Sequence, residues 1–340
     1  MDKAIDFVVL WVDGADPAWQ AQRAKYCPDA ADNGNDPNRY RDWDLMRYWF
    51  RGVEAFAPWV NRVFFVTCGQ APDWLDTTNP KLRLVRHSDY IPAEFLPTFN
   101  SNVIELWLHN IPDLSEQFVL FNDDMFLTAP VKPTDFFVDG LPLESALLEQ
   151  PATDSTDDCL PHMLLNNSAI LNKHFRKKSV LRQHARKFFT LKYGKDLLRN
   201  VLLAPFQFFS AFRDPHLPSA YRKSTFREVW QAEERLLLET STHRFRSKGD
   251  LTHWLMKGWQ FCTGQFQPRS TSWGRHYELW EDNIETIYDS ITHQTHRVIC
   301  LNDSKSDIDF DHLKERLNRS FEMLLPEPSS FEREFGQEEP

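Results

Sequence analysis

Two adjacent carboxylates interrupt an otherwise apolar stretch of the sequence. Residues 117–128 read QFVLFNDDMFLT, in which Asn122, Asp123 and Asp124 separate two strand-like runs. Burying an unpaired carboxylate is costly, so a chain that keeps two here must give them a partner. A divalent cation such as Mg²⁺ or Mn²⁺ takes oxygen ligands and commonly contacts substrate phosphates as well. The pair therefore suits a cation site for phosphate chemistry, although a helix cap or a salt bridge at a strand end explains it equally well.

The bulk composition limits the classes of function. A net charge of −10 argues against a nucleic-acid binder, so an anionic substrate needs a local basic pocket or a metal. We expect no signal peptide and no membrane span, because the N-terminal apolar run is short and ends in an aspartate. Five cysteines without CxxC spacing predict reduced thiols, a cytoplasmic protein and no zinc site.

The elements that must position these carboxylates form an alternating pattern. Runs rich in Val, Ile and Phe predict strands, while Leu45, Trp49 and Val53 recur at helical spacing between Asp42, a candidate N-cap, and the helix stop Pro58. Such alternation predicts a mostly parallel, Rossmann-like α/β sheet, whose ligands bind at the carboxyl ends of the strands. The predicted strands are residues 5–12, 62–69, 82–87 and 117–127, and a further helix is predicted within residues 100–112.

Several long strings resemble the signature blocks of one family, the Stealth proteins. This family of sugar-1-phosphate transferases includes bacterial capsular polysaccharide phosphotransferases and the lysosomal-enzyme N-acetylglucosamine-1-phosphotransferase. The strings cover most of residues 5–140 and 213–303 in the family's order, which is far more specific than a short motif. They are IDFVVLWVDGADP, RYRDWDLMRYWFRGVEAFAPWVNRVFFVTCGQAPDWL, LPTFNSNVIELWLHNIPDLSEQFVLFNDDMFL, DPHLPSAYRKSTFREV with THRFRSKGD, and RVICLND.

The resemblance implies a reaction and a glycosyltransferase-A-like fold. A UDP-sugar would donate hexose-1-phosphate or N-acetylhexosamine-1-phosphate to a hydroxyl of an acceptor sugar, forming a phosphodiester and releasing UMP, in capsular or surface polysaccharide synthesis. Attack at phosphorus calls for in-line geometry, a base near the hydroxyl, and cations around the phosphoryl oxygens. Two alternatives stay open: a conventional metal-dependent glycosyltransferase that releases UDP, and a non-catalytic carbohydrate-binding protein.

The family pattern implies roles for the acidic residues. Asp124 matches a metal ligand, with Asp123 as a second ligand or an orienting group and Asn122 as a substrate contact. Asn302 and Asp303, in the string CLND, would complete the coordination of Mg²⁺ or Mn²⁺.

A histidine and an arginine match the remaining catalytic positions. His216, in the string DPHLP, matches the family's catalytic histidine, and imidazole is the side chain whose ordinary pKa of ~6.5 suits a general base. Asp303 is the alternative base. Arg246 would grip the transferring phosphate through its planar guanidinium, although Arg244 is close enough to exchange roles with it.

The donor-binding candidates have competing structural explanations. Asp6 and Asp13 lie in the first block, but Asp6 could equally begin a strand, and the family often carries Asn at position 13. A phosphate contact by Arg41 competes with an ion pair at the start of a helix. Asn100 and Asn102 precede a helix, where capping is ordinary, yet their amides could also hold sugar hydroxyls or phosphate oxygens.

The blocks divide the chain into regions. We expect one catalytic domain over residues 1–325, built from 1–150 and 206–325 with a helical insert at 151–205, followed by a mobile acidic tail over 326–340. The insert contains a strongly basic helical segment, residues 174–200. That segment suits a solvated helical face, a contact with an anionic polymer, or peripheral contact with the inner face of the plasma membrane beside a lipid-linked acceptor. The sequence leaves the oligomeric state open.

Overall fold

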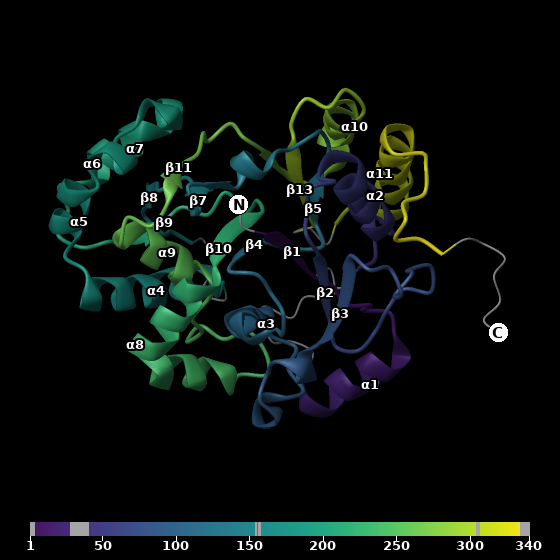
Figure 1. Ribbon diagram of the computed structural model, residues 1–340, viewed down its shortest axis with the longest axis horizontal. Coiled ribbons are helices and arrows are strands. Elements are labelled where there is room, and N and C mark those ends of the chain that lie inside the picture. Colours follow the sequence, from purple (N-terminus) through teal and green to yellow (C-terminus); the bar gives the residue numbers. More distant parts are fainter. Residues whose placement is uncertain (1–3, 28–40, 154, 156–157, 304–306, 334–340) are drawn as a thin grey trace.

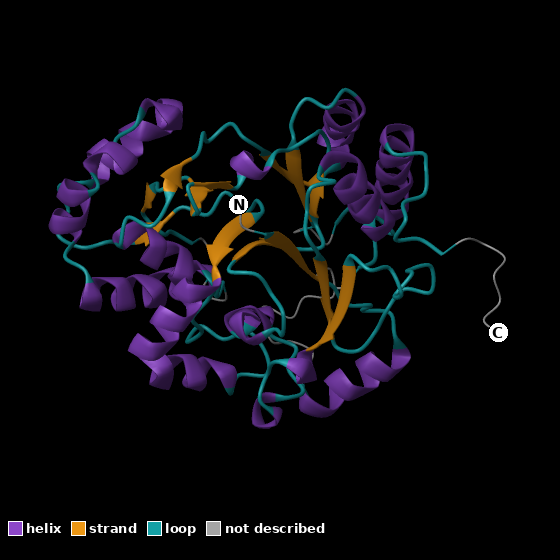
Figure 2. Ribbon diagram, viewed as in Figure 1, coloured by secondary structure: helices purple, strands orange, loops and turns teal. Residues whose placement is uncertain are grey.

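The computed structural model describes residues 4–27, 41–153, 155, 158–303 and 307–333. Its strands lie in the middle of the molecule with helices around them (Figure 2). The largest sheet has the order β10-β4-β1-β2-β3, in which β10 runs antiparallel to β4 and the other pairs are parallel. The predicted mostly parallel α/β sheet is therefore confirmed. Its strands are β1 (Ile5–Leu10), β2 (Val63–Thr67), β3 (Leu82–Arg86), β4 (Gln117–Phe121) and β10 (Ser219–Arg222).

Alternate residues of the central strands enter two different cores. In β1, Phe7 and Val9 belong to one buried cluster, whereas Val8 belongs to the other. This follows from the two-residue period of a strand, and it explains why the strands read as continuous apolar runs. The first core is covered by α2 (Met46–Phe56), α10 (Ile284–Thr292) and α11 (Phe310–Leu324). The second is covered by α3 (Ser101–Leu106), α4 (Leu160–His174), α8 (Lys223–Ser241) and α9 (Trp254–Cys262).

The predicted strand 117–127 is two strands that belong to different sheets. After β4, the chain turns at Asn122–Asp124 and continues as β5 (Met125–Leu127). β5 pairs antiparallel with β13 (Val298–Asn302), which also pairs parallel with β12 (Arg275–Glu278). Because the Leu301 amide donates to the Asp124 carbonyl at 2.8 Å, the acidic turn lies against the end of β13.

Shorter elements complete the fold. α1 (Pro17–Tyr26) begins at Asp16, whose carboxylate accepts from the Ala18 amide. The small sheets are β6 (Phe137–Val138), β7 (Leu141–Glu144) and β11 (Gln267–Pro268), and β8 (Leu148–Glu149) with β9 (Ala211–Phe212). Three-residue 3₁₀ helices in the described part of the chain include η2 (His87–Asp89), η3 (Ala93–Phe95), η4 (Leu108–Asn110), η5 (Pro133–Asp135) and η7 (Glu281–Asn283).

The basic segment is helical, as predicted, but broken. It contains α5 (Lys177–Gln183), α6 (Ala185–Phe188), η6 (Leu191–Asp196) and the start of α7 (Leu197–Leu203). These helices follow one outer edge of the molecule, at the left of Figure 1. Among the described residues, no helix combines the length and apolar character needed to span a membrane.

Two local predictions are wrong. Asp42 does not cap α2, which begins at Met46; its carboxylate instead accepts from the Asp44 amide at 2.8 Å. The tail predicted from residue 326 is packed over residues 326–333: Phe331 is 2% exposed, and its ring centroid lies 5.1 Å from that of Phe50. The segment is polar in composition, but Phe331 packs against a core residue that is distant in sequence, which the local composition could not predict. Residues 334–340 lie outside the described part of the chain.

Candidate active site

A cavity of about 420 Å³ lies at the carboxyl edge of the central sheet. Trp11, just past the end of β1, contributes to its wall, as do the turn after β4 and the end of β13. This is the location expected for a ligand site in an open parallel sheet. Its polar and charged lining includes Arg41, Asp42, Thr98, Ser101, Glu105, Asn122, Asp123, Asp124, His216, Arg246, Asn302 and Asp303.

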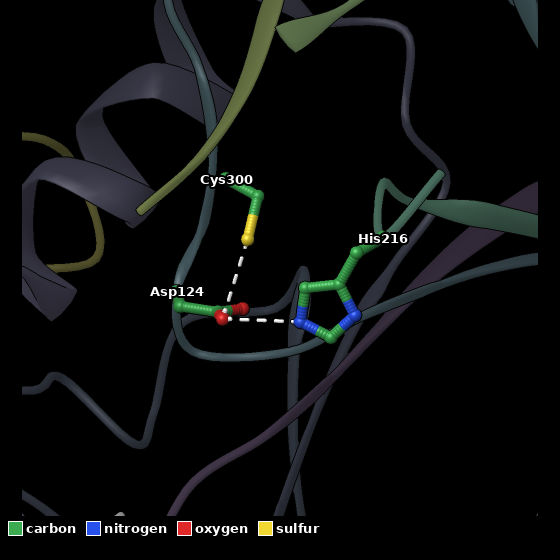
Figure 3. Close-up of side chains that lie close together, drawn as sticks. All are labelled: Asp124, His216 and Cys300. Atoms are coloured by element: carbon green, nitrogen blue, oxygen red, sulfur yellow. Dashed lines mark hydrogen bonds and ion pairs between the residues drawn. The ribbon is translucent and has the colours of Figure 1, made fainter. Parts of the chain in front are cut away.

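Two side chains, His216 and Cys300, converge on the carboxylate of Asp124 (Figure 3). One oxygen of Asp124 lies 3.3 Å from His216 Nε2 and 3.3 Å from the Cys300 Sγ, whose thiol donates to it. Asp124 comes from the β4–β5 turn, His216 from the segment before β10, and Cys300 from β13. In the described part of the chain, their ligand atoms lie within 4.8 Å of one another and could hold a metal ion.

The backbone holds His216 in an uncommon conformation. Its φ of +49° lies in the left-handed region, which non-glycine residues seldom adopt. The His216 amide donates to Asp214 Oδ2 at 3.1 Å, and Asp214 in turn accepts from Lys257 Nζ at 2.6 Å. The side chain of Lys257 is only 4% exposed, so this ion pair anchors the histidine loop from inside the protein.

The two carboxylates around His216 favour its charged form. Burial alone would lower the pKa of His216, but Asp124 and Asp214 raise it well above the ordinary value. Burial alone would also raise the pKa of Asp124, but His216 holds that pKa below its ordinary value. The imidazole therefore carries a proton at neutral pH when Asp124 has no other counter-charge.

The geometry around Asp124 fits a cation. Its Oδ1 is buried and has no hydrogen-bond partner among the described residues. Asp123 lies next to it, where surrounding protein atoms and the Asp124 charge raise the pKa of Asp123 to about 7. Burial raises the pKa of the Cys300 thiol, which consequently keeps its proton and donates to Asp124. With the thiol protonated, the carboxylate oxygens of Asp124 and its neighbour Asp123 are the groups of the type that Mg²⁺ or Mn²⁺ takes as ligands.

The other two predicted metal ligands line the same cavity with partners of their own. Asn302 donates its amide N–H groups to the Glu278 carboxylate at 3.1 Å. Asp303 lies 3.7 Å from the Arg41 guanidinium. The structure therefore brings all four predicted ligands to one cavity, and their roles stay predictions.

Comparison with known proteins identifies the family. Three family profiles match: Stealth protein conserved region 1 over residues 3–27, conserved region 2 over residues 39–142, and conserved region 4 over residues 289–340. A capsular polysaccharide phosphotransferase, WcwK, from Streptococcus pneumoniae is 42% identical over 97% of this chain and 98% of its own. The chain belongs to the Stealth family.

Other Stealth relatives are similar over comparable lengths. The exopolysaccharide phosphotransferase cps2G of Lactiplantibacillus plantarum is 43% identical over 97% of this chain and 96% of its own. The receptor polysaccharide phosphotransferase WefC of Streptococcus gordonii is 40% identical, covering 98% of this chain and 100% of its own. The predicted enzyme class, a phosphotransferase, is thereby confirmed. The solved structure of a bifunctional glycosyltransferase, WbbM, aligns with 95% of this chain and 51% of its own chain. The sequence identity is 8% and the TM-score is 0.37.

Within this Stealth site, the structure separates Arg246 from Arg244. Arg246 lines the cavity, where its Nη2 donates to Ser101 Oγ at 2.7 Å. Arg244 instead donates to the Pro97 carbonyl, and its guanidinium lies 4.6 Å from the centroid of the Tyr26 ring. Of the two arginines, Arg246 is therefore the one that lines the cavity.

The structure corrects the interpretation of Asn100 and Asn102. Both side chains are buried and donate to Asp250 Oδ2, at 2.8 and 3.0 Å. Asp250 also accepts from the Ser247 amide, so the two asparagines fix the loop that carries Arg246. The residue between them, Ser101, faces the cavity instead. Asn100 also caps α3, as the sequence allowed.

Asp6 and Asp13 also have structural roles. Asp6 is fully buried near the amino end of β1, where it accepts from the Asn61 amide and the Ser115 backbone N–H, each at 2.7 Å. That end of the strand is opposite the cavity, so Asp6 does not bind the donor. Asp13 accepts from the Ala15 amide within a turn.

Three functional features escaped the sequence analysis. Glu105 lines the cavity, and burial raises the pKa of its carboxyl to about 8. Burial also lowers the pKa of His253 to about 3. His253 Nε2 lies 3.6 Å from Glu105 Oε2, and at pH 7 both side chains are therefore mainly neutral. The i,i+4 spacing of Ser101 and Glu105 could have placed them on one face of α3. No sequence pattern indicated Cys300 or the pairing of Lys257 with Asp214.

Proposed function

We propose that this protein transfers hexose-1-phosphate or N-acetylhexosamine-1-phosphate from a UDP-sugar to a hydroxyl of an acceptor sugar. The new bond joins the acceptor oxygen to the phosphorus next to the sugar, and the bond from that phosphorus to the departing UMP breaks. The acceptor becomes part of a phosphodiester in a capsular or exopolysaccharide. The polysaccharide phosphotransferase relatives support this reaction class.

One observation carries the proposal: an acidic pair, a histidine and an arginine face the same cavity. Arg246 is the phosphate-binding group, because a guanidinium can contact two phosphate oxygens at once. His216 is the group that takes the acceptor proton, and its carboxylate partners Asp124 and Asp214 orient the ring. A protein that only binds carbohydrate needs no such base, which favours an enzyme.

The cation would be Mg²⁺ or Mn²⁺. Asp124 and Asp123 would hold it, with Asn302 and Asp303 beside them, and it would supply positive charge for the donor diphosphate. The unpartnered Asp124 Oδ1 supports this placement. The partners are then a UDP-sugar donor and a carbohydrate acceptor, lipid-linked in our proposal, at the cytoplasmic face where nucleotide sugars are available.

The products test this function. Incubation with a panel of UDP-sugars, acceptor oligosaccharides and Mg²⁺ is expected to release UMP and to give a phosphodiester signal in phosphorus NMR. An excess of EDTA is expected to stop turnover, and added Mg²⁺ to restore it. Release of UDP without phosphorus in the product would establish a conventional glycosyltransferase, and sugar binding without turnover a non-catalytic protein.

A further inference from the structure

Exposed large apolar side chains are concentrated in one short segment of the chain. Seven of the twelve exposed large hydrophobic residues among the described positions fall within residues 189–208. Isolated exposed apolar side chains are common on soluble proteins, but contiguous ones mark interaction surfaces. Leu191 is the most exposed, at 89%. The seven are Phe189, Leu191, Leu198, Val201, Leu202, Phe206 and Phe208.

Helix α7 shows how this exposure arises. Leu198, Val201 and Leu202 have i, i+3 and i+4 spacing, so they lie on one helix face, and they are 61%, 51% and 62% exposed. The helix is anchored through Asn200, which is fully buried, donates to the carbonyls of Ala146 and Phe188, and accepts from the Leu148 amide. The fold therefore holds the polar residue inside and presents the leucines outside.

An overlapping segment of the chain is rich in positive charge. Residues 174–200 contain nine lysines and arginines and one acidic residue, whereas the whole chain has a net charge of −10. Lys177 donates to the carbonyls of Leu203 and Phe208, and Lys187 donates to those of Gly264 and Phe266. Six others are exposed and form no ion pair with a carboxylate in the part of the chain that the structure describes, although Lys192 donates to the Pro268 carbonyl: Arg176, Lys178, Arg182, Arg186, Lys192 and Lys195.

We propose that the seven apolar and six basic side chains form one membrane-docking patch, which binds the surface of an anionic lipid bilayer. The apolar side chains would enter the interface between headgroups and acyl chains, and the basic ones would contact lipid phosphates. The insert helices form one outer edge of the molecule in Figure 1, away from α2 and α11. A flat lipid surface can therefore approach that edge without meeting those helices.

The apolar component decides between a membrane and a soluble polymer. An anionic polysaccharide would account for the basic side chains, but it offers no apolar environment for Leu191, Leu198 or Phe206. A bilayer interface satisfies both components, because it combines negative headgroups with acyl chains. Docking would be peripheral, and it goes beyond the proposed transfer reaction, since it involves a different surface.

Vesicle binding tests the patch independently of activity. The intact protein is expected to co-sediment with phosphatidylglycerol vesicles at low salt and only weakly with phosphatidylcholine vesicles. Arg186→Ser/Lys195→Ser is expected to weaken binding to the anionic vesicles by about fivefold for each charge removed. Leu198→Ser/Leu202→Ser is expected to weaken it by about tenfold. All four side chains are at least partly exposed, so folding should be preserved, and the melting temperature checks this.

Matched substitutions elsewhere provide the controls. Leu165 is 49% exposed on α4 and Lys25 is exposed on α1, both outside the patch. Leu165→Ser and Lys25→Ser are expected to bind vesicles as tightly as the unchanged protein. Failure to bind anionic vesicles, or equal loss in the control and patch variants, would overturn the proposal. A third outcome would also overturn it: the protein binds alginate, an anionic polysaccharide, tightly, the leucine substitutions leave this binding unchanged, and the protein does not bind vesicles.

Discussion

A single imidazole between two carboxylates dominates the chemistry at the residue scale. Asp124 and Asp214 raise the pKa of His216 well above its ordinary value in the cation-free protein. A cation on Asp124 would lower this pKa, so the neutral form that can accept a proton increases as the pH rises through the His216 pKa of the cation-bound protein. Turnover should increase over the same range. Turnover increases with pH, and does not decrease, because the deprotonated form of His216 is the active one.

His216→Ala is expected to lower turnover by about 10² to 10⁴, the usual contribution of a general base, with little change in donor affinity. The acidic limb of the pH–rate profile should disappear, because the group that produced it is gone. Rate measurements across pH, with calorimetry for donor affinity, check both effects. His162→Ala, at an exposed site on α4, is the control. A preserved acidic limb with lost donor binding would reassign His216 as a ligand and make Asp303 the next candidate base.

Arg246→Lys is expected to behave differently. The guanidinium meets the phosphate in both the ground state and the transition state, so the substitution should weaken donor binding as well as turnover, each by about tenfold. Lysine keeps the charge but loses the planar pair of donors. Calorimetry with a UDP-sugar measures the affinity. Arg235→Lys, at an exposed ion pair on α8, is the matched control; unchanged donor affinity in Arg246→Lys would remove Arg246 from the phosphate site.

The start of α3 illustrates the scale of a single element. Three consecutive polar residues there have different partners. Asn100 and Asn102 donate to Asp250 inside the protein, while Ser101 faces the cavity and accepts from Arg246. The inward pair holds together two segments that are about 150 residues apart in sequence. A substitution of Asn100 or Asn102 should therefore lower the stability of the fold, whereas a substitution of Ser101 should weaken ligand binding.

Asn100→Ala is expected to lower the free energy of unfolding by about 2 kcal/mol, because it removes one donor to the buried Asp250 carboxylate and leaves the Asn102 amide at the start of α3 without its cap. Ser101→Ala is expected to leave that energy nearly unchanged and to weaken donor binding. Denaturant unfolding and calorimetry separate the two variants. If Asn100→Ala kept full stability and lost donor binding, the asparagine would be a ligand after all.

The C-terminal segment contributes at the scale of the whole molecule. Residues 326–333 return to the core next to α2, where Arg51 donates to both oxygens of the Glu332 carboxylate, at 2.8 and 3.0 Å. Both side chains are less than a tenth exposed. Burial alone would raise the pKa of Glu332, but Arg51 and the Ser329 amide lower it below the ordinary value of 4.5.

Glu332→Gln is expected to destabilise the protein by about 2 kcal/mol at pH 7, because Arg51 loses its charged partner. A carboxylate with a lowered folded-state pKa contributes stability above pH 4.5, and this contribution disappears as the pH falls through the folded-state value. The difference between the two proteins should therefore shrink below pH 4.5. Unfolding curves at several pH values measure it, with Glu327→Gln at an exposed site as the control. A difference that stays constant with pH would contradict the ion-pair explanation.

Much of the architecture was readable from local patterns in the sequence. Apolar runs placed β1, β2 and β3 to within a few residues and found the start of β4, although the predicted single strand 117–127 is β4, a turn at Asn122–Asp124 and β5. Resemblance to the family placed His216 and Arg246, which the structure brings to the same cavity as the acidic pair. These features depend on neighbouring residues or on long matching strings, so the chain alone was sufficient to predict them.

The partner of each polar side chain was decided only by the tertiary structure. Asp6 meets Ser115, Asp124 meets Cys300, and Glu332 meets Arg51, across separations of 109, 176 and 281 residues. A local pattern shows that a side chain is polar and which element carries it, but a buried hydrogen bond is set by whichever distant segment packs against that element. For this reason the sequence identified Asn100 and Asp6 as candidate ligands, and only the folded chain showed that Asn100 holds the loop of Arg246 and that Asp6 is bonded to Asn61 and Ser115 at the opposite end of β1.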